Sequence, residues 1–254
     1  NLGIHGAGAA NAADALAAVE KFVFQEQSLA PDELLSALDN DFIGYEPLRE
    51  RLAQEAPKVG NDDPTADRYL VALFDMLADA CEDFGPTTRA GVLRPGTGSA
   101  MYYIWLAAGH DGMREPVVGA TAEGRQKGHP LGANLAPSQG APIQGPFSTL
   151  LSFGKIDYRR ICNGGPVTIE LSDSVFRPVD SIHKVALLVR AFTAAGCQQL
   201  QLNSLNVAQL REAQMHPELY RNLIVRVWGW SGYFCELSTE YQEQIIARHM
   251  FAVH

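Results

Sequence analysis

A run of nine residues, AMYYIWLAA from Ala100 to Ala108, is almost wholly apolar and aromatic. A strand with one face in water alternates polar and apolar residues, and this run shows no such alternation. The run therefore predicts a strand that is buried on both faces, like a parallel strand covered by helices. Any fold of this chain has to cover both sides of that strand.

The remaining elements alternate between helical and strand patterns. Apolar residues at helical spacing predict a helix that begins at Pro31 and helices over 11–26, 65–84, 179–195, 207–214 and 239–250. Asn11 and Asp14 are candidate caps near the start of the first of these. Strands are predicted over 167–171 and 223–227, and over 199–203, where polar and apolar residues alternate as in a half-buried strand. Glycines mark 111–146 as a long irregular stretch.

Composition supports a folded chain and excludes some partners. Of the 254 residues, 46% are hydrophobic and 19% charged, which suits a buried core in one large domain or two small ones. Acidic residues outnumber basic ones by 29 to 20, and the net charge of −9 argues against nucleic acid or an anionic membrane as partner. No run of 18 apolar residues is present, so no membrane span is predicted.

The chain start and the cysteines bear on origin and compartment. The first residues, NLGIHG, contain no initiator methionine and no basic leader, so we expect them to come from the middle of a protein. Four cysteines, at 81, 162, 197 and 235, form no Cys-x-x-Cys pair, which favours a reducing cytoplasm. The seven histidines show no ligand spacing, so no metal is predicted; a site built from distant loops would leave no such pattern.

Two glycine motifs come close to functional patterns without matching them. Gly6-x-Gly8 before a helix is similar to a dinucleotide fingerprint, but Asn11 stands where the third small residue belongs, so we favour a tight turn. Gly229-Trp230-Ser231-Gly232 has glycine directly after serine, whereas a nucleophile elbow requires Gly-x-Ser-x-Gly. The sequence therefore favours neither a nucleotide site nor a serine hydrolase.

The segment RVWGWSGYF, residues 226–234, places one glycine between two tryptophans directly after a predicted strand. One interpretation is a hairpin tip in which Gly229 supplies a positive φ. The other uses the missing side chain differently, because an α-carbon radical on glycine can lie flat and delocalise over the adjacent amides. Bulky neighbours would then keep water and oxygen away.

The C-terminal part of the chain resembles the glycyl radical domain of glycyl radical enzymes over residues 198–206, 210–237 and 241–249. That domain has an Arg-Val-x-Gly-aromatic turn, a following Phe and Leu, and an Ile-Ile-x-Arg helix. Gly229 matches the radical-bearing glycine, and Arg226 and Val227 match the strand before it. The residues that match the closing helix are Gln242, Ile245, Ile246 and Arg248.

The resemblance extends upstream over most of the chain. Residues 3–16 are similar to a glycine-rich helix start of the family, and 60–64 to its GNDD loop. Residues 119–125 resemble its GATPDGR loop, with Ala122 and Glu123 in place of Pro and Asp. Asn163-Gly164 resembles its Asn-Gly turn. Several separated motifs occur in the family's order, so the chain is identified as a member.

The resemblance implies the C-terminal half of a ten-stranded α/β barrel of the pyruvate formate-lyase-like type. Residues 1–197 would belong to the barrel domain and 198–254 would form the glycyl radical domain. A partner activating enzyme, which uses S-adenosylmethionine and an iron–sulfur cluster, would abstract hydrogen from Gly229, and the chain itself would bind no cofactor. The expected assembly is a homodimer.

The family passes the stored radical to a cysteine, which becomes a thiyl and attacks the substrate. That cysteine lies upstream of the glycine-rich helix start, so we expect it in a missing N-terminal part. Cys235 is close to Gly229 in sequence, but the family's cysteine lies on the opposite loop, and we interpret Cys235 as structural. A separate polypeptide that completes a split enzyme is the alternative.

The substrate interpretation rests on the residues around Gly229. RVWGWSGYF resembles the arylacetate decarboxylases, whereas dehydratases of polar substrates tend to have RVAGY or RVSGY. We expect indoleacetate first, then phenylacetate or 4-hydroxyphenylacetate. The expected neighbours of the radical are Arg226, Val227, Trp228, Trp230, Ser231 and Tyr233, and the expected pocket residues are Tyr103, Trp105, Leu106 and His5.

Alternative roles for these residues stay open. Each pocket aromatic, taken singly, is better interpreted as core, and His5 as a loop histidine bonded to backbone. Another glycyl radical lyase, dehydratase or carbon–carbon adding enzyme would share the same motifs. A non-catalytic repair subunit that supplies only the radical domain is a further alternative.

Overall fold

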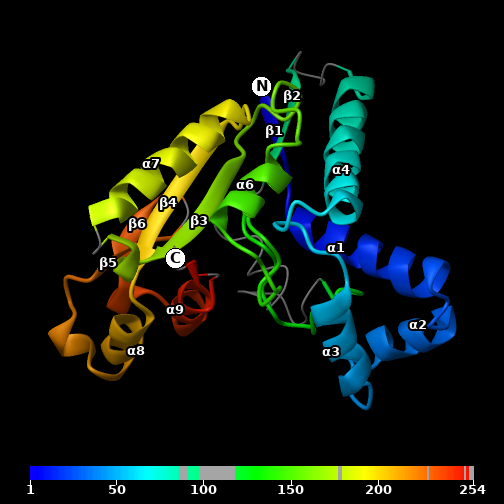
Figure 1. Cartoon of the computed structure of the whole chain (residues 1–254), viewed down its shortest axis with the longest axis horizontal. Helices are drawn as coiled ribbons and strands as arrows, with labels where there is room; N and C mark the ends of the chain where they lie inside the picture. Colours follow the sequence, from blue (N-terminus) through cyan, green and yellow to red (C-terminus); the bar gives the residue numbers. More distant parts are fainter. Residues whose placement is uncertain (86–90, 98–117, 177–178, 228, 249, 252–254) are drawn as a thin grey trace.

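Helices fill most of the first 85 residues (Figure 1). The structure is a computed structural model, which describes residues 1–85, 91–97, 118–176, 179–227, 229–248 and 250–251. The N-terminal helices are α1 (Ala9–Val19), continued by a π-helix over Glu20–Gln25, α2 (Pro31–Asp39), α3 (Glu46–Glu55) and α4 (Pro64–Asp83). Prolines open α2 and α4, where the missing amide hydrogen costs nothing.

Most of the strands are parallel. β1 (Leu2–Gly6) pairs with β2 (Leu93–Thr97), and β3 (Pro166–Ser172) lies between β4 (Gln199–Leu205) and β7 (Met250–Phe251). β5 (Ile224–Arg226) and β6 (Ser231–Tyr233) form an antiparallel hairpin. The other helices are α6 (Pro146–Phe153), α7 (Val179–Ala194), α8 (Val207–Met215) and α9 (Thr239–Ile246), with 3-10 turns over Asp173–Phe176, Pro217–Leu219 and Phe234–Glu236. Helix α7 joins two parallel strands, which confirms the α/β class.

The predicted elements in the second half are largely confirmed. Strands expected over 167–171 and 199–203 are β3 and β4, and the helices over 179–195 and 207–214 are α7 and α8. The apolar run at 100–108, which includes the proposed pocket residues Tyr103, Trp105 and Leu106, lies outside the described residues.

Two predicted boundaries are wrong. The sequence predicts a last helix that reaches residue 250, but α9 ends at Ile246, and Met250–Phe251 pairs with β3 instead. An unpaired strand edge offers backbone hydrogen bonds that compete with a further helical turn. The turn expected over 228–232 is shorter, because Ser231 already belongs to β6.

The capping roles expected for Asn11 and Asp14 are also wrong. The N-cap of α1 is Gly8, in the left-handed region at φ 71°, and it has no side-chain cap. Asn11 and Asp14 are buried and bind other segments: Asn11 accepts from the Gly132 amide at 2.7 Å, and Asp14 accepts from the Val59 amide at 2.7 Å. These side chains join α1 to the irregular stretch and to the loop before α4 instead of starting the helix.

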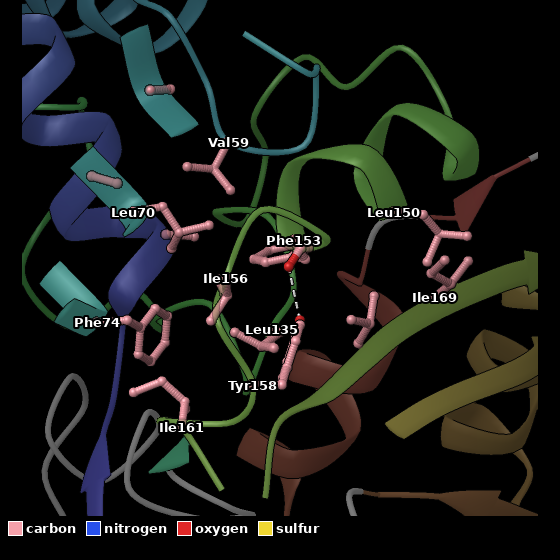
Figure 2. Packing of buried hydrophobic residues seen from close by; sticks show 14 of the residues in the cluster. Val59, Leu70, Phe74, Leu135, Leu150, Phe153, Ile156, Tyr158, Ile161 and Ile169 are labelled. Carbon is pink, nitrogen blue, oxygen red and sulfur yellow. Dashed lines mark hydrogen bonds between the residues drawn. The ribbon is translucent and has the colours of Figure 1, made fainter. Parts of the chain in front are cut away.

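The main core lies between α1, α4, α6 and the β3 sheet. Figure 2 shows side chains from these elements meeting around Leu135 and Phe153, both at most 1% exposed. Tyr158 is buried among them, and its hydroxyl donates to the Phe153 carbonyl at 2.8 Å. A second cluster packs the β5–β6 hairpin against α8 and α9, and a third joins α1 to α2 and α3. The hairpin therefore has its own apolar support.

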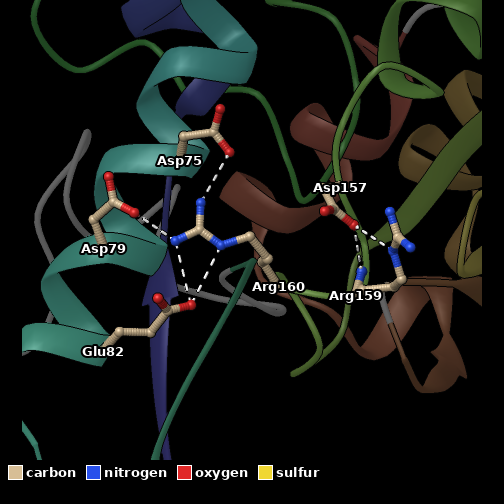
Figure 3. A network of polar contacts seen from close by, with 6 residues as sticks. All are labelled: Asp75, Asp79, Glu82, Asp157, Arg159 and Arg160. Carbon is tan, nitrogen blue, oxygen red and sulfur yellow. Dashed lines mark hydrogen bonds and ion pairs between the residues drawn. The ribbon is translucent and has the colours of Figure 1, made fainter.

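Arg160 ties the segment before β3 to helix α4 (Figure 3). Its guanidinium contacts Asp75 at 3.4 Å, Asp79 at 2.5 Å and Glu82 at 3.2 Å, one helical turn apart along α4. These carboxylates are solvent-exposed, so each pair contributes little alone. The network orients the Asn163-Gly164 turn, whose backbone bonds β2 through Pro95 and Thr97.

The proposed division at residue 197 falls between α7 and β4. β4 pairs with β3 along its whole length, from Pro166↔Gln199 to Ser172↔Leu205. The division stays a prediction. Among the described residues, no helix combines the length and the apolar character that a bilayer crossing requires.

Candidate functional site

The hairpin that carries Gly229 is a tight one. Its last inter-strand pair is Arg226↔Ser231, and the Val227 amide donates to the Trp230 carbonyl at 2.9 Å. Gly229 has φ 72°, a conformation that costs other residues about 1–2 kcal/mol. Apart from its two sequence neighbours, no atom of the described residues lies within 4 Å of a Cβ built on Gly229. Glycine is therefore required here by backbone conformation and not by crowding.

The hairpin is buried at its base and exposed at its tip. Val225 and Val227 are 2% and 0% exposed, whereas Gly229 is exposed and Trp230 is 39% exposed. The Trp230 ring lies against Gly232, where a Cβ would come within 2.8 Å of it. The small residue at 232 thus makes room for the indole.

The sequence-predicted neighbours of Gly229 are brought together by strand pairing. Arg226 lies opposite Ser231 and donates to its hydroxyl at 3.3 Å, and Tyr233 lies opposite Ile224. Trp228 lies outside the described residues. Tyr233 is 43% exposed, so in this chain the expected shield around the glycine is partial.

A buried arginine holds the strand that leads to Gly229. Arg248 donates from Nη1 to the Arg226 carbonyl and from Nη2 to the Val227 carbonyl, each at 2.9 Å. It also pairs with Glu170 Oε1 at 2.9 Å, and both side chains are at most 5% exposed. Asn203 donates to the same Glu170 oxygen at 2.8 Å. Four segments of the chain, around residues 170, 203, 226 and 248, meet at this point.

Glu170 and Asn203 were not predicted from the sequence. Glu170 interrupts the apolar segment VTIEL, Asn203 lies in the alternating segment LQLNS, and the two are direct partners in the β3–β4 register. Buried polar groups are normally hydrogen-bonded, so a matched polar pair inside two core strands is the pattern that could have found them.

Cys235 lies on the helical side of the hairpin. Its Sγ donates to the carbonyls of Tyr220 at 3.5 Å and Ala213 at 3.8 Å. Burial raises the pKa of the Cys235 thiol, and the charges of Glu218 and Glu236 raise it further. A raised thiol pKa and backbone partners are typical of a structural cysteine.

His5 belongs to another part of the molecule. It lies on β1, and its Nε2 is 2.8 Å from Nδ2, the side-chain amide nitrogen of Asn163. In Figure 1 strand β1 lies well away from the β5–β6 hairpin. A Cβ on Gly96 would lie 1.9 Å from the Asn163 carbonyl oxygen, so the Asn163-Gly164 turn presses directly on this sheet.

A cavity of about 800 Å³ lies between α3, α9 and the 123–130 loop. Glu123 lines it and accepts from Asn11 Nδ2 at 2.8 Å and Thr121 Oγ1 at 2.9 Å. The neighbouring Arg125 donates to the His129 carbonyl at 2.7 Å and closes the loop on itself. Within the described ranges, no three His, Cys, Asp or Glu side chains are grouped to hold a metal ion.

Comparison with protein families gives two matches along the chain. The family described as pyruvate formate lyase-like matches residues 1–106, and the family described as glycine radical matches residues 131–235. The second match contains the Gly229 hairpin. The two matches follow each other in chain order.

Curated relatives are similar over nearly all of this chain but are much longer. The probable dehydratase YbiW of Escherichia coli (strain K12) is 32% identical over 95% of the chain and 30% of its own length. Trans-4-hydroxy-L-proline dehydratase of Clostridioides difficile is 31% identical over 96% and 30%. Indoleacetate decarboxylase of Tractidigestivibacter scatoligenes is 27% identical over 95% and 29%. The chain therefore spans about a third of each relative.

Solved structures also superpose on nearly all of this chain while extending far beyond it. The B12-independent glycerol dehydratase from Clostridium butyricum, in its glycerol-bound form, superposes with a TM-score of 0.90 at 30% identity, over 99% of this chain and 31% of that one. A glycyl radical enzyme from Archaeoglobus fulgidus gives a TM-score of 0.84 at 31% identity, over 97% and 30%.

Proposed function

The chain belongs to the glycyl radical enzyme family and forms part of the α/β barrel of a larger enzyme, and from this premise we propose that Gly229 stores the radical of a lyase. The observation that carries the proposal is the hairpin: a glycine at φ 72° on an exposed tip, held from behind by Arg248. A Cα with no side chain and free space around it can become planar without displacing a neighbour.

The proposed reaction begins with loss of one hydrogen atom from Gly229 Cα to a radical S-adenosylmethionine activating enzyme. The Cα radical then takes the hydrogen of a cysteine S–H, so a C–H bond forms while the S–H bond breaks and a thiyl results. That cysteine lies in the part of the enzyme outside this chain. When the product radical takes hydrogen back from the thiol, the cycle returns the radical to Gly229.

For the substrate we propose an arylacetate, with indoleacetate first, then phenylacetate and 4-hydroxyphenylacetate. Decarboxylation would give the methylarene and carbon dioxide. The aromatic segment RVWGWSGYF and the apolar run at 100–108 support this, and an indoleacetate decarboxylase is among the relatives. Tyr103, Trp105 and Leu106 are the proposed ring contacts, and His5 is the weakest member of that set because it bonds Asn163 instead.

A dehydratase of a small polar substrate is the second candidate. Two dehydratases are 31% and 32% identical to this chain, against 27% for the indoleacetate decarboxylase. Product analysis separates the two. Activated full-length protein should release skatole, toluene or p-cresol from the three arylacetates, and dehydration of glycerol or hydroxyproline without arylacetate turnover would replace the decarboxylase proposal.

The radical assignment is tested with oxygen. After activation and exposure to air, we expect cleavage at Gly229, with a C-terminal product that begins near Trp230. Gly229→Ala should remove both this cleavage and the doublet EPR signal. Gly196→Ala is the matched control, because Gly196 has the same φ of 72° and equally open surroundings. An EPR-active sample whose chain stays intact in air would refute the assignment.

We propose that this chain works beside an N-terminal part that supplies the thiyl cysteine, in a homodimer, with an activating enzyme as transient partner. The alternative is a non-catalytic repair subunit. The intact mass of the native protein separates them, since a repair subunit would be a separate chain that begins near Asn1.

A further inference from the structure

The guanidinium of Arg248 binds two successive backbone carbonyls, those of Arg226 and Val227. In a regular strand, successive carbonyls point to opposite sides, so one side chain cannot bind both. The contact is possible here because β5 ends at Arg226 and the chain turns toward Gly229. Arg248 therefore binds at the place where the strand becomes the turn, three and two residues before the glycine.

Arg248 is itself fixed in place. Glu170 Oε1 accepts from Arg248 Nη1 at 2.9 Å and from Asn203 Nδ2 at 2.8 Å. Glu170 lies on β3, the middle strand of its sheet, which is among the most buried parts of the molecule. With side-chain exposures of 5% and 4%, Arg248 and Glu170 are shielded from water, so loss of one would leave the other charge buried.

We propose that Arg248 is a positioning residue for Gly229 and that Glu170 fixes the guanidinium that does so. The inference rests on the proposed role of Gly229 as the radical site. The position of the radical then depends on β3, the middle strand of the sheet, through the buried Arg248–Glu170 ion pair, as well as on the hairpin. The two planar donors of arginine suit two carbonyls, which lysine cannot bind in the same way.

Misplacing a reacting atom by about 1 Å can reduce a rate by about 10²-fold. We therefore expect Arg248→Met to lower kcat about 10- to 100-fold while KM changes little, because Arg248 acts through the hairpin and not on the substrate. Arg248→Lys keeps the charge opposite Glu170 and one donor, so its kcat should be intermediate. Glu170→Gln should resemble Arg248→Lys.

The control variant is Arg211→Met. Arg211 also binds helix α9, through Glu243 at 2.6 Å, but it is 49% exposed and lies on α8. None of its hydrogen bonds given by the structure reaches β5. This variant removes an arginine ion pair between α8 and α9 while leaving the carbonyls of Arg226 and Val227 bound.

The first measurement is hydrogen exchange over residues 224–233 in the full-length protein before activation. Exchange should be faster in Arg248→Met and Glu170→Gln than in wild type, and unchanged in Arg211→Met. Equal exchange in Arg248→Met and Arg211→Met would overturn the inference. If Arg248→Met does not fold, Arg248→Lys carries the same comparison with a smaller expected effect.

The second measurement is the EPR doublet with kcat and KM after activation. A changed doublet splitting together with a reduced kcat in the Arg248 variants supports the inference. A wild-type splitting and a wild-type kcat in these variants oppose it. The two proposals fail separately. Absence of any doublet in wild type would refute the role of Gly229, while the exchange experiment would still show whether Arg248 holds the hairpin.

Discussion

At the residue scale, the buried polar side chains of α1 bind segments that are far away in sequence. Asp14 is 0% exposed and accepts from the Val59 amide and, at 2.5 Å, from the Ser138 hydroxyl. Burial raises the pKa of Asp14 from 3.8 to about 7, although the charge of Lys58 and the two hydrogen bonds oppose the rise. A carboxyl group that holds three segments together is thus stabilised in its neutral form.

We predict a pH-dependent contribution from Asp14 to stability. The folded pKa lies above the unfolded one, so the contribution is complete below pH 4 and is lost as pH rises through about 7. Asp14→Asn is neutral at every pH. Relative to wild type, the variant should gain stability between pH 4 and pH 8, by up to roughly 4 kcal/mol at about 1.4 kcal/mol per pKa unit. Thermal denaturation of the full-length proteins across that range measures it.

Asp39→Asn is the control for this prediction, because Asp39 is exposed at the end of α2. Its stability, measured across the same pH range, gives the effect of replacing an exposed carboxylate by an amide. A pH-independent difference for Asp14→Asn would contradict the raised pKa.

Sequence reasoning at this scale singles out Gly229 and, by resemblance, Arg248, but it does not predict the contact between Arg248 and the hairpin or the partner Glu170. A glycine between two tryptophans is a local pattern, visible without a fold. The partners Glu170 and Arg248 are 78 residues apart, and only the β3 sheet and the end of α9 bring them together. The sequence misplaces Asn11 and Asp14 as caps for the same reason, since nothing local distinguishes a cap from a long-range hydrogen bond.

At the element scale, helix α6 determines the shape of the Gly60–Pro64 loop. The Ser152 hydroxyl accepts from the amides of Gly60 at 3.0 Å and Asp62 at 2.9 Å. Gly60 and Asp62 both have positive φ, at 106° and 56°, so the loop depends on these contacts to keep an uncommon conformation. The loop in turn places Asp63, which caps α4.

We predict that Ser152→Ala destabilises the protein by about 1–3 kcal/mol, because it leaves a buried amide without an acceptor. Urea denaturation measures the loss of global stability, and hydrogen exchange at residues 60–63 measures the local effect on the loop. Ser204→Ala, at an exposed position on β4, is the control. Equal stability of the two variants would mean that the loop keeps its shape without Ser152.

Elements with clear apolar patterns are predictable, and those without are not. The 20-residue helix α4 has a continuous buried stripe. Helix α3, with the sequence EPLRERLAQE, buries only Leu52, so its pattern is that of a polar loop. Strand β2 contains Pro95 and Gly96, which usually mark turns, yet it pairs with β1 because Gly96 admits the Asn163 backbone.

At the scale of the whole molecule, the chain exposes more surface than a self-contained domain. Its accessible surface is 12991 Å², whereas a compact monomer of this mass exposes about 11,000 Å². Large apolar side chains contribute, with Phe24, Ile43 and Phe84 at 70%, 73% and 74% exposed. The chain spans about a third of its relatives, and we propose that the N-terminal part inferred above covers this surface.

We predict that residues 1–254 produced alone expose apolar surface that the full-length protein buries. The isolated chain should bind the dye ANS more strongly and sediment as aggregates. Dye fluorescence and analytical ultracentrifugation of both proteins test this. A monomeric isolated chain with no extra dye binding would instead favour a separate subunit.

The order β4-β3-β7 has a mechanical consequence. The chain leaves β3's sheet at Leu205 and returns to it at Met250, on the two edges of a single strand. With neighbouring strands about 4.8 Å apart, the two attachment points lie roughly 10 Å from each other. Residues 206–249, which include the β5–β6 hairpin, α8 and α9, therefore begin and end close together, like a domain inserted into another domain. Moving this segment as one unit would break the buried Arg248–Glu170 ion pair, which joins it to β3.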